Sequence, residues 1–253
     1  MPYHGIDTVR RFTAADAKNA AASGVSFVGR YLVPAAYPKA LTSDEIRALR
    51  GAGLAILPCW EIGGADMRGG AAQGAADGAE ARRIAEGFGV GAGTSIFFAC
   101  DFSPAASELD TLAAYLRAAA RELGAYRCGV YGSFAVVEGM ARRGACDAFW
   151  QCCAWSGGRV SARAGVYQYQ WQGGPEAQAL ADKLGFAVDL DTCADMAAAG
   201  LWLAEDPLPK EDTPWYAADM AWAEARGLIR DGRPDDGVTR AELAAVLRRL
   251  AGE

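Results

Sequence analysis

The segment Ser95-Ile96-Phe97-Phe98-Ala99-Cys100-Asp101 is an almost unbroken apolar run that ends in a carboxylic acid. A strand with one face in water would alternate apolar and polar residues, whereas this segment is apolar on both faces. Strands of this kind belong to parallel sheets whose two faces are both covered. The segment therefore predicts a buried strand in a parallel α/β fold.

Seven further segments share this character, and the early ones alternate with Ala-rich helical stretches. Such alternation is typical of an α/β fold. The predicted strands span residues 4–7, 25–31, 54–61, 95–101, 127–131, 148–152, 165–170 and 186–191. The predicted helices span residues 13–22, 42–51, 77–88, 107–123 and 133–143. Later connections are shorter or rich in glycine, so we expect the last quarter of the sheet to be irregular.

Eight such strands can close into a barrel or form an open, doubly wound sheet. Open sheets that bind nucleotides carry a G-x-G-x-x-G motif or a phosphate loop after a strand, and the sequence has neither. This absence favours the barrel. The predicted fold class is α/β, a (β/α)8 TIM barrel with a small C-terminal α-helical module.

The boundary between the two parts is a charged, proline-rich segment at residues 205–214, which we interpret as a linker. It separates the barrel, residues 1–204, from a tail, residues 215–253, that is predicted to form two short helices. The second helix begins at a capping box made by Thr239 and Glu242. A module of about 40 residues buries little surface by itself, so we expect it to dock or associate.

The composition excludes several classes of function. A net charge of −6 argues against a nucleic-acid partner, which requires a basic surface. No apolar run approaches the roughly 18–20 residues of a membrane span, and no signal peptide is apparent, so we expect no membrane insertion and synthesis in the cytoplasm. Seven cysteines in an odd, irregular set and a single histidine, His4, predict reduced thiols, no metal and no cofactor.

Polar or aromatic residues stand at the predicted C-terminal end of every strand. The active site of a barrel is built at that end, from several strands at once. Aromatic rings stack on the apolar faces of sugars, while carboxylates and amides bind hydroxyl groups, so this composition predicts a carbohydrate site. The residues expected to bind substrate are Tyr31, Trp60, Tyr131, Gln151, Trp155, Gln168, Asp189 and Asp191.

Three acids at strand ends, Asp7, Glu61 and Asp101, form the predicted catalytic set. Glycoside hydrolysis uses one carboxyl group as proton donor and a second as base, nucleophile or charge stabiliser. Glu61 follows an apolar strand and Trp60, and burial beside that ring would raise its pKa, so we assign it as the donor. Asp101 and Asp7 are assigned as base or stabiliser. Taken singly, each acid could instead cap the loop or helix that follows its strand.

Eight motifs follow one another at particular intervals along residues 3–200. They are Gly5-Ile6-Asp7, Val28-Gly29-Arg30-Tyr31-Leu32, Lys39-Ala40-Leu41-Thr42, Gly53 through Glu61, Ile96-Phe97-Phe98-Ala99-Cys100-Asp101-Phe102, Gly129-Val130-Tyr131-Gly132, Trp150-Gln151 with Ala154-Trp155-Ser156, and Val188-Asp189-Leu190-Asp191.

Together these motifs resemble one known family, the glycoside-hydrolase-like domain of unknown function found in bacterial cell-wall-associated and phage lysin-type proteins. The resemblance implies a TIM barrel related to the family-twenty-five lysozymes, with a site at Asp7, Glu61 and Asp101. It also implies Asp-x-Glu at the end of strand four, whereas this sequence has Ser103 at the position of the glutamate.

The tail resembles a single S-layer-homology repeat, most specifically at Thr239-Arg240-Ala241-Glu242. Such repeats typically work in threes to bind wall polymers, so a lone copy implies weak binding, trimerisation or loss of the anchoring role. A helical pair that only packs on the barrel is the alternative interpretation.

These observations predict a glycoside hydrolase that acts on bacterial cell-wall glycan, as a muramidase or lysin does on peptidoglycan, after release from the cell. Ser103 keeps open a first alternative, a non-catalytic barrel that binds cell-wall carbohydrate. A second alternative is a structural or assembly protein that associates through its C-terminal module. The polar lining predicted at the strand ends favours a ligand site over a purely structural role.

Overall fold

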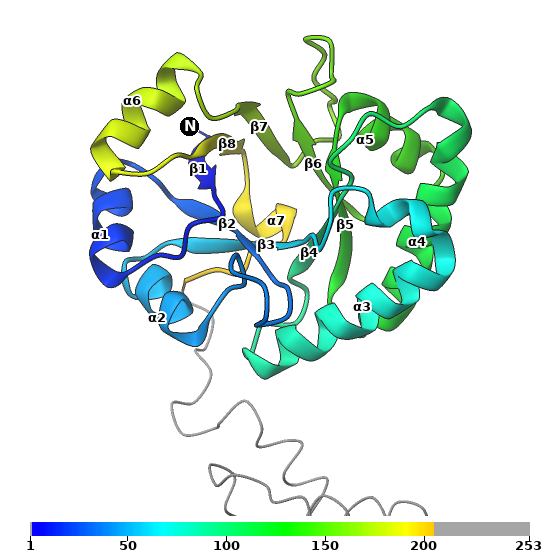
Figure 1. Cartoon of the computed structure of the whole chain (residues 1–253), viewed down its shortest axis with the longest axis horizontal. Coiled ribbons are helices and arrows are strands. Elements are labelled where there is room, and N and C mark those ends of the chain that lie inside the picture. The colour runs from blue at the N-terminus through cyan, green and yellow to red at the C-terminus, as the bar shows by residue number, and fades with distance from the viewer. Residues whose placement is uncertain (1, 205–253) are drawn as a thin grey trace, which may run out of the picture. The chain divides into compact units, whose positions relative to one another are not determined.

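The computed structural model describes residues 2–204, in which eight strands close into one barrel (Figure 1). Each strand pairs with the next, and the last pairs with the first. The strands are β1 (Tyr3–Asp7), β2 (Phe27–Tyr31), β3 (Ala55–Trp60), β4 (Ser95–Ala99), β5 (Arg127–Gly132), β6 (Ala148–Cys152), β7 (Val166–Gln170) and β8 (Asp189–Cys193). The predicted α/β barrel of eight strands is confirmed.

The chain divides into two units, Met1–Pro207 and Leu208–Glu253. The predicted linker at 205–214 and the predicted S-layer-homology-like module at 215–253 lie outside the described residues.

Helices cover the outside of the barrel, and the short last helix lies near its centre in the view of Figure 1. Four helices begin at side-chain caps supplied by Thr13, Thr42, Ser133 and Asp195, each of which accepts a hydrogen bond from the first turn. The helices are α1 (Ala14–Ala22), α2 (Ser43–Gly51), α3 (Gly70–Gly87), α4 (Leu109–Glu122), α5 (Phe134–Arg142), α6 (Pro175–Leu184) and α7 (Met196–Ala199), with 3-10 turns η1 (Asp66–Gly69) and η2 (Ala106–Glu108).

Helix α3 begins seven residues before the predicted start at residue 77. Its glycines suggest a loop because glycine disfavours helix, but here they allow close packing on α4. A Cβ at Gly74 would lie 2.1 Å from the Tyr115 carbonyl oxygen, and one at Gly78 would lie 2.6 Å from that of Ala119. Tertiary packing therefore overrides the local helix propensity.

Strand β8 runs antiparallel to both of its neighbours, β1 and β7, which corrects the all-parallel prediction. Helix α6, also not predicted, ends at Gly185 in a left-handed conformation (φ 83°), and only three residues separate that glycine from β8. The chain thus enters β8 at the end of the barrel where β1 to β7 finish. Asp189 is consequently the first residue of its strand rather than one near its end, and it pairs with Asp7, the last residue of β1.

Alternate residues of each strand pack in two separate apolar clusters. The outer cluster lies between the strands and the helices and includes Val28, Ile56 and Phe98. The inner cluster fills the barrel with side chains such as Phe97 and Trp150. The segment that follows β8 also joins the inner cluster, through residues 199 and 201, and closes the N-terminal end of the barrel. The C-terminal end of the barrel carries polar side chains instead.

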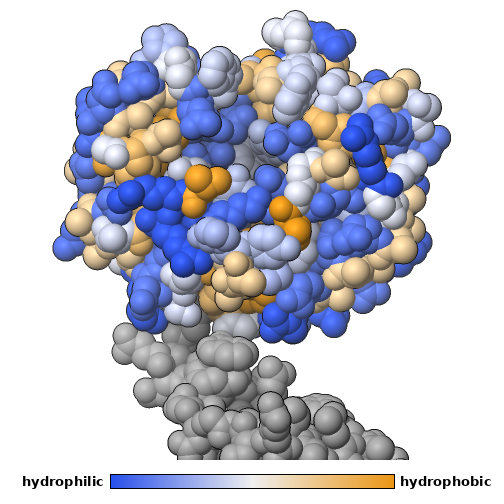
Figure 2. Space-filling model, viewed as in Figure 1, coloured by the Kyte–Doolittle hydropathy of each residue, from blue (hydrophilic) through white to orange (hydrophobic). Residues whose placement is uncertain are grey.

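The face of the described residues seen in Figure 2 is mostly hydrophilic, with small and separate apolar patches. Among residues 2–204, no helix combines the length and apolar character needed to cross a lipid bilayer.

Candidate active site

The inward-facing residues at the C-terminal end of the barrel bring together most of the predicted site. Cys59 and Phe97 belong to the inner cluster, so Glu61 and Asp101, two and four residues further along, continue the inward alternation. The same spacing carries Asp7, Tyr31, Tyr131 and Gln168 inward from their strands. Hydrogen bonds, ion pairs and mutual electrostatic effects connect this group, which also includes Asp189 and Asp191. Their roles in catalysis or binding stay predictions.

Gln168 is the centre of the hydrogen-bond network. Its Nε2 donates to Asp7 Oδ2 at 2.8 Å and to Asp189 Oδ2 at 3.3 Å. Its Oε1 accepts a hydrogen bond from the Tyr131 hydroxyl at 3.0 Å. The backbone N–H of Gln172 donates to the other oxygen of Asp189. These contacts fix the amide orientation of Gln168 and hold the two carboxyl groups on either side of one nitrogen.

Asp191 lies deeper in the barrel and is fully buried. Its Oδ1 accepts a hydrogen bond from Trp150 Nε1 at 2.8 Å, while its Oδ2 has no N–H or O–H donor. Burial, and then the nearby Asp7 carboxyl, raise the pKa of Asp191 well above its usual range. Two buried acids side by side are stable only if a proton is held between them, so we infer that Asp7 and Asp191 share one near neutral pH.

Gly29 makes the room for this arrangement. A Cβ at that position would lie 2.6 Å from Asp7 Cβ and 3.2 Å from the Trp150 ring. Any larger residue would therefore push the carboxyl group or the indole out of place.

The carboxyl group of Asp7 has a raised pKa. Burial is the largest cause of its shift, and the charge of Asp189 adds to it, while hydrogen bonds from Gln168 and Asp191 oppose it; the pKa of Asp7 rises to about 7. A carboxyl group with that pKa is protonated in a large fraction of molecules at neutral pH. It can therefore serve as a general acid, the role predicted for Glu61.

Glu61 has a different environment from the one expected. Its Oε1 accepts a hydrogen bond from Lys39 Nζ at 2.9 Å, and both side chains are 18% exposed. Lys39 Nζ also lies 4.4 Å from the centroid of the Tyr31 ring. The carboxyl group of Glu61 therefore contacts a cation and solvent, and not the apolar pocket that was expected beside Trp60. Its role as proton donor stays a prediction.

A buried ion pair positions this lysine. Arg30 and Glu45 are 0% and 1% exposed, with Arg30 Nε 2.6 Å from Glu45 Oε1. The same guanidinium donates to the backbone carbonyls of Thr8 and Lys39. Arg30 thereby ties the loop after β1 to the loop after β2, and so holds Lys39 beside Glu61.

Trp60 does not belong to the site, which corrects its predicted role in substrate binding. Neighbouring strand residues point to opposite faces, so while Glu61 faces inward, Trp60 faces the helices. Its ring is 3% exposed in the outer cluster, 6.5 Å from the ring of Phe98. It can neither stack on a sugar in the barrel mouth nor desolvate Glu61.

Gln151 does not line the barrel mouth either, which corrects its predicted role in substrate binding for the same reason. Its neighbour Trp150 faces inward, so the Gln151 side chain lies outside, fully buried. It donates to the carbonyl of Arg159 at 2.8 Å and accepts from the backbone N–H of Ser161 at 2.7 Å. Gln151 therefore holds the loop between β6 and β7 and does not contact a ligand in the barrel mouth.

The remaining predicted residues are open to solvent. Asp101 is exposed, whereas the other acids of the site are buried or half-buried. The part of its side chain that is buried, and then the charge of Glu61, raise the pKa of Asp101. Trp155 is 50% exposed on the β6–β7 loop. Trp171, immediately after β7, is 60% exposed and was not predicted, although an aromatic residue just past a strand end is the signal used for the others.

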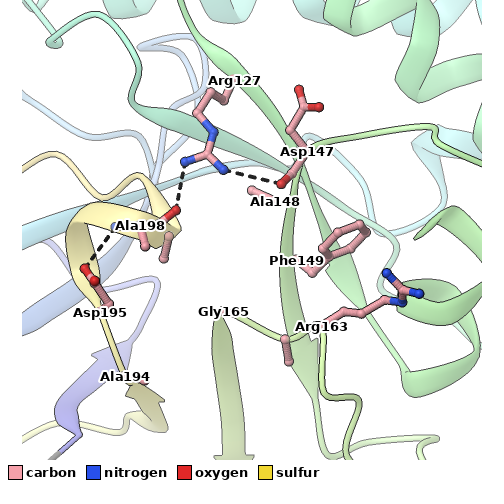
Figure 3. A pocket seen from close by; sticks show the side chains of 11 residues that line it. Arg127, Asp147, Ala148, Phe149, Arg163, Gly165, Ala194, Asp195 and Ala198 are labelled. Atoms are coloured by element: carbon pink, nitrogen blue, oxygen red, sulfur yellow. Dashed lines mark hydrogen bonds between the residues drawn. The ribbon is translucent and has the colours of Figure 1, made fainter.

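Among residues 2–204, no group of three or more His, Cys, Asp or Glu side chains is arranged to hold a metal ion. A cavity of about 280 Å³ lies at the N-terminal end of the barrel, away from these acids (Figure 3). Its Arg127 donates to the carbonyls of Ala198 and Asp147, and its Asp195 caps α7. These groups satisfy one another, so we assign the cavity no function.

Comparisons with known proteins place the chain in a family. A family model described as "Rv2525c-like, glycoside hydrolase-like domain" matches residues 18–189. The crystal structure of the Tat-secreted protein Rv2525c from Mycobacterium tuberculosis in complex with L-tartrate is similar over 79% of this chain and 98% of that one, with 22% identity and a TM-score of 0.66.

Two other similar structures have lower scores. The modular autolysin LytC from Streptococcus pneumoniae has 10% identity over 76% of this chain and 46% of that one, with a TM-score of 0.49. The catalytic domain of endolysin ply40 from bacteriophage P40 of Listeria monocytogenes has 13% identity over 78% and 96%, with a TM-score of 0.45. No curated protein matches the sequence. On the family match, the chain belongs to the Rv2525c-like, glycoside hydrolase-like domain family.

Proposed function

We propose that this barrel is a glycoside hydrolase that acts on bacterial cell-wall glycan, with Asp7 as its proton donor. The observation that carries the proposal is the cluster of the Asp7, Asp189 and Asp191 side chains at the end of the barrel where such folds build active sites. Burial in this cluster raises the pKa of Asp7 to about 7. Glycoside hydrolases need a carboxylic acid that keeps its proton until it meets the leaving-group oxygen. Asp191 would support this role as the partner that shares the proton.

Asp189 would be the second carboxyl group. It accepts hydrogen bonds from Gln168 and from the backbone N–H of Gln172. Burial, and then the charge of Asp101, raise the pKa of Asp189, and the hydrogen bond from Gln172 opposes this rise. The bonds of 2.8 and 3.3 Å that Gln168 Nε2 makes to Asp7 and Asp189 set their oxygens no farther apart than the sum of those lengths. That limit is below the roughly 6.5–9.5 Å typical of inverting enzymes, so hydrolysis with retention is expected.

Aromatic and charged groups around these acids suit a sugar ligand. Tyr31 and Tyr131 face inward from β2 and β5, and their rings can pack on the apolar face of a pyranose. Asp101 and the Lys39–Glu61 pair offer acceptors and a donor for hydroxyl groups. Cell-wall glycan is proposed as the substrate because the sequence motifs resemble those of cell-wall-associated and lysin-type domains.

The test is digestion of purified peptidoglycan by the full chain. Reducing ends should appear, mass spectrometry should identify disaccharide or longer glycan products, and NMR of the fresh products should show the retained anomer. Asp7→Asn should slow the release of products by about 10²–10⁴-fold, whereas Lys183→Ala, at the end of α6, should leave the rate unchanged.

A second candidate, a barrel that binds wall glycan without cleaving it, is favoured by one observation. The chain carries Ser103 at the position where the resemblance to lysozyme barrels implies a glutamate. If the full chain sediments with peptidoglycan and releases no product over days, this second function replaces the first.

A further inference from the structure

Two exposed tryptophans, Trp155 and Trp171, lie beyond the acids at the same end of the barrel. Cys152 and Gln168 pair across β6 and β7, and each tryptophan follows its paired residue by three positions. The backbone N–H of Cys153 donates to the Gln168 carbonyl at 2.8 Å, so the two strands are still paired where the loops begin. The β6–β7 connection projects as a loop at the top of Figure 1. The two indoles therefore stand on neighbouring loops.

Trp155 is held in an unfavourable backbone conformation. Its φ of 54° is the only positive value at a non-glycine position in the described part of the chain, and a bulky residue rarely adopts it. Such strain persists where the surroundings impose it, commonly at ligand sites. Burial of the ring does not offset the strain, because half of the residue is exposed. Packing of the Trp155 ring in the core therefore does not explain why a bulky residue stands at this position.

The loop that carries Trp155 is firmly built. Ser156 Oγ donates to the Cys152 carbonyl at 2.6 Å and accepts a hydrogen bond from the backbone N–H of Phe134 at 2.9 Å. Gln151 holds the far side of the same loop through residues 159 and 161. An aromatic side chain on a loop whose backbone is already fixed loses less conformational entropy on binding than one on a mobile loop.

Trp171 is linked directly to the proposed catalytic acids. The next residue, Gln172, donates its backbone N–H to Asp189, so the Trp171 backbone is fixed relative to that carboxylate. Gly173 leaves room for the indole, because a Cβ there would lie 3.2 Å from the Trp171 ring. A ligand that reaches Asp189 can therefore extend over this ring.

We propose that Trp155 and Trp171 form a binding subsite for pyranose units that lie beyond the cleavage position, on the β6–β7 side of the barrel. The inference rests on the proposed function for the identity of the ligand, a glycan chain, and deepens it by requiring a chain of several sugars. Pyranose rings present apolar C–H faces and polar edges, which match flat indoles next to the hydrogen-bonding groups of Gln168 and Asp189. A disaccharide held at the acids would leave this subsite empty.

The test measures binding separately from cleavage. The full chain carrying Asp7→Asn is titrated calorimetrically with chitohexaose and with chitobiose, two β-1,4-linked oligomers that differ only in length. Trp155→Gly and Trp171→Ala should each weaken chitohexaose binding about tenfold, a typical loss for one stacked ring, and change chitobiose binding less than about twofold. Trp171→Phe, which keeps a ring, should retain most of the affinity. Val160→Ala, at an apolar residue that is 53% exposed on the same loop, is the matched control and should bind as the parent does.

Stability separates a binding role from a structural one. Glycine accepts the positive φ of residue 155, so Trp155→Gly should keep or raise the melting temperature while it loses affinity. The proposal is overturned if the parent does not bind chitohexaose, if the tryptophan variants bind it unchanged, or if Trp155→Gly unfolds several degrees lower. It is also overturned if these variants lose only self-association in sedimentation. Tryptophan-dependent binding by a chain that never cleaves glycan would uphold the subsite and refute only the hydrolase.

Discussion

Replacing Asp7 by asparagine should make the protein more stable, and more so at higher pH. The pKa of Asp7 rises from 3.8 to about 7 in the folded chain. Ionisation therefore favours the unfolded state, and the stability that this group contributes is complete only below about pH 4 and falls until the pH passes about 7. From these two pKa values, ionisation of Asp7 lowers the free energy of unfolding by about 4 kcal/mol at pH 8 and by about 1.5 kcal/mol at pH 5.

Asparagine removes this loss without emptying the site. Its carbonyl can still accept the hydrogen bond from Gln168, and its NH2 can donate to the Asp191 oxygen that has no donor. Urea unfolding followed by tryptophan fluorescence, at pH 5 and pH 8, should show Asp7→Asn gaining stability over the parent, with the larger gain at pH 8. Asp44→Asn, at a side chain that is 89% exposed and paired with Arg47 on the surface, should change the free energy of unfolding by less than about 1 kcal/mol at both pH values. A loss of stability in Asp7→Asn at pH 8, or an equal change at both pH values, would refute the reasoning about this carboxyl group.

Three further substitutions test other parts of the structure. Trp202→Ala should lower the free energy of unfolding by about 3–5 kcal/mol, because the indole is fully buried. A chain that ends at Gly200 also loses the backbone bridge between Trp202 and Ile56 and should be at least equally weakened, whereas a chain that ends at residue 204 should melt like the parent in calorimetry. Arg30→Met should cost about 3–5 kcal/mol in urea unfolding by leaving Glu45 buried without its partner, and a change under about 1 kcal/mol would contradict the role given to the ion pair. Glu61→Gln should slow glycan cleavage less than Asp7→Asn does and should keep the decline of rate at alkaline pH, whereas loss of that decline would restore Glu61 as the proton donor.

The barrel could be predicted because apolar runs and their alternation with helices are properties of the local sequence. Seven of the eight predicted strands begin and end within two residues of the observed ones, and the eighth begins three residues early. The last was placed too early because Val188 and the two residues before it are apolar but belong to the turn after α6. Its direction could not be predicted, since an apolar strand has the same pattern in either direction. The seven-residue error at α3 has the opposite cause, since close packing on α4 overrode the low helix propensity of glycine.

The gathering of polar side chains at one end of the barrel was predicted in outline, while their roles stay predictions. The position at or near the end of a strand pointed to Asp7, Asp101 and Gln168, but it did not say which residues face inward. Trp60 and Gln151 were misplaced because their strands are apolar on both faces, which hides the alternation. A raised pKa was expected at Glu61 from its chain neighbour. The structure raises the pKa of Asp7, through burial in the closed barrel and then the charge of Asp189, which is more than 180 residues away in the sequence. Only the closed sheet brings these acids together.

The most direct test is the pH dependence of peptidoglycan cleavage by the full chain and by Asp7→Asn. The parent should release reducing ends at a rate that falls as the pH rises through about 7, because Asp7 then loses the proton it must donate. Asp7→Asn should be slower by about 10²–10⁴-fold and should still sediment with the wall material. Cleavage by Asp7→Asn at the parent rate, or binding of wall glycan by the parent with no cleavage at any pH, would contradict the assignment of Asp7 as the catalytic acid.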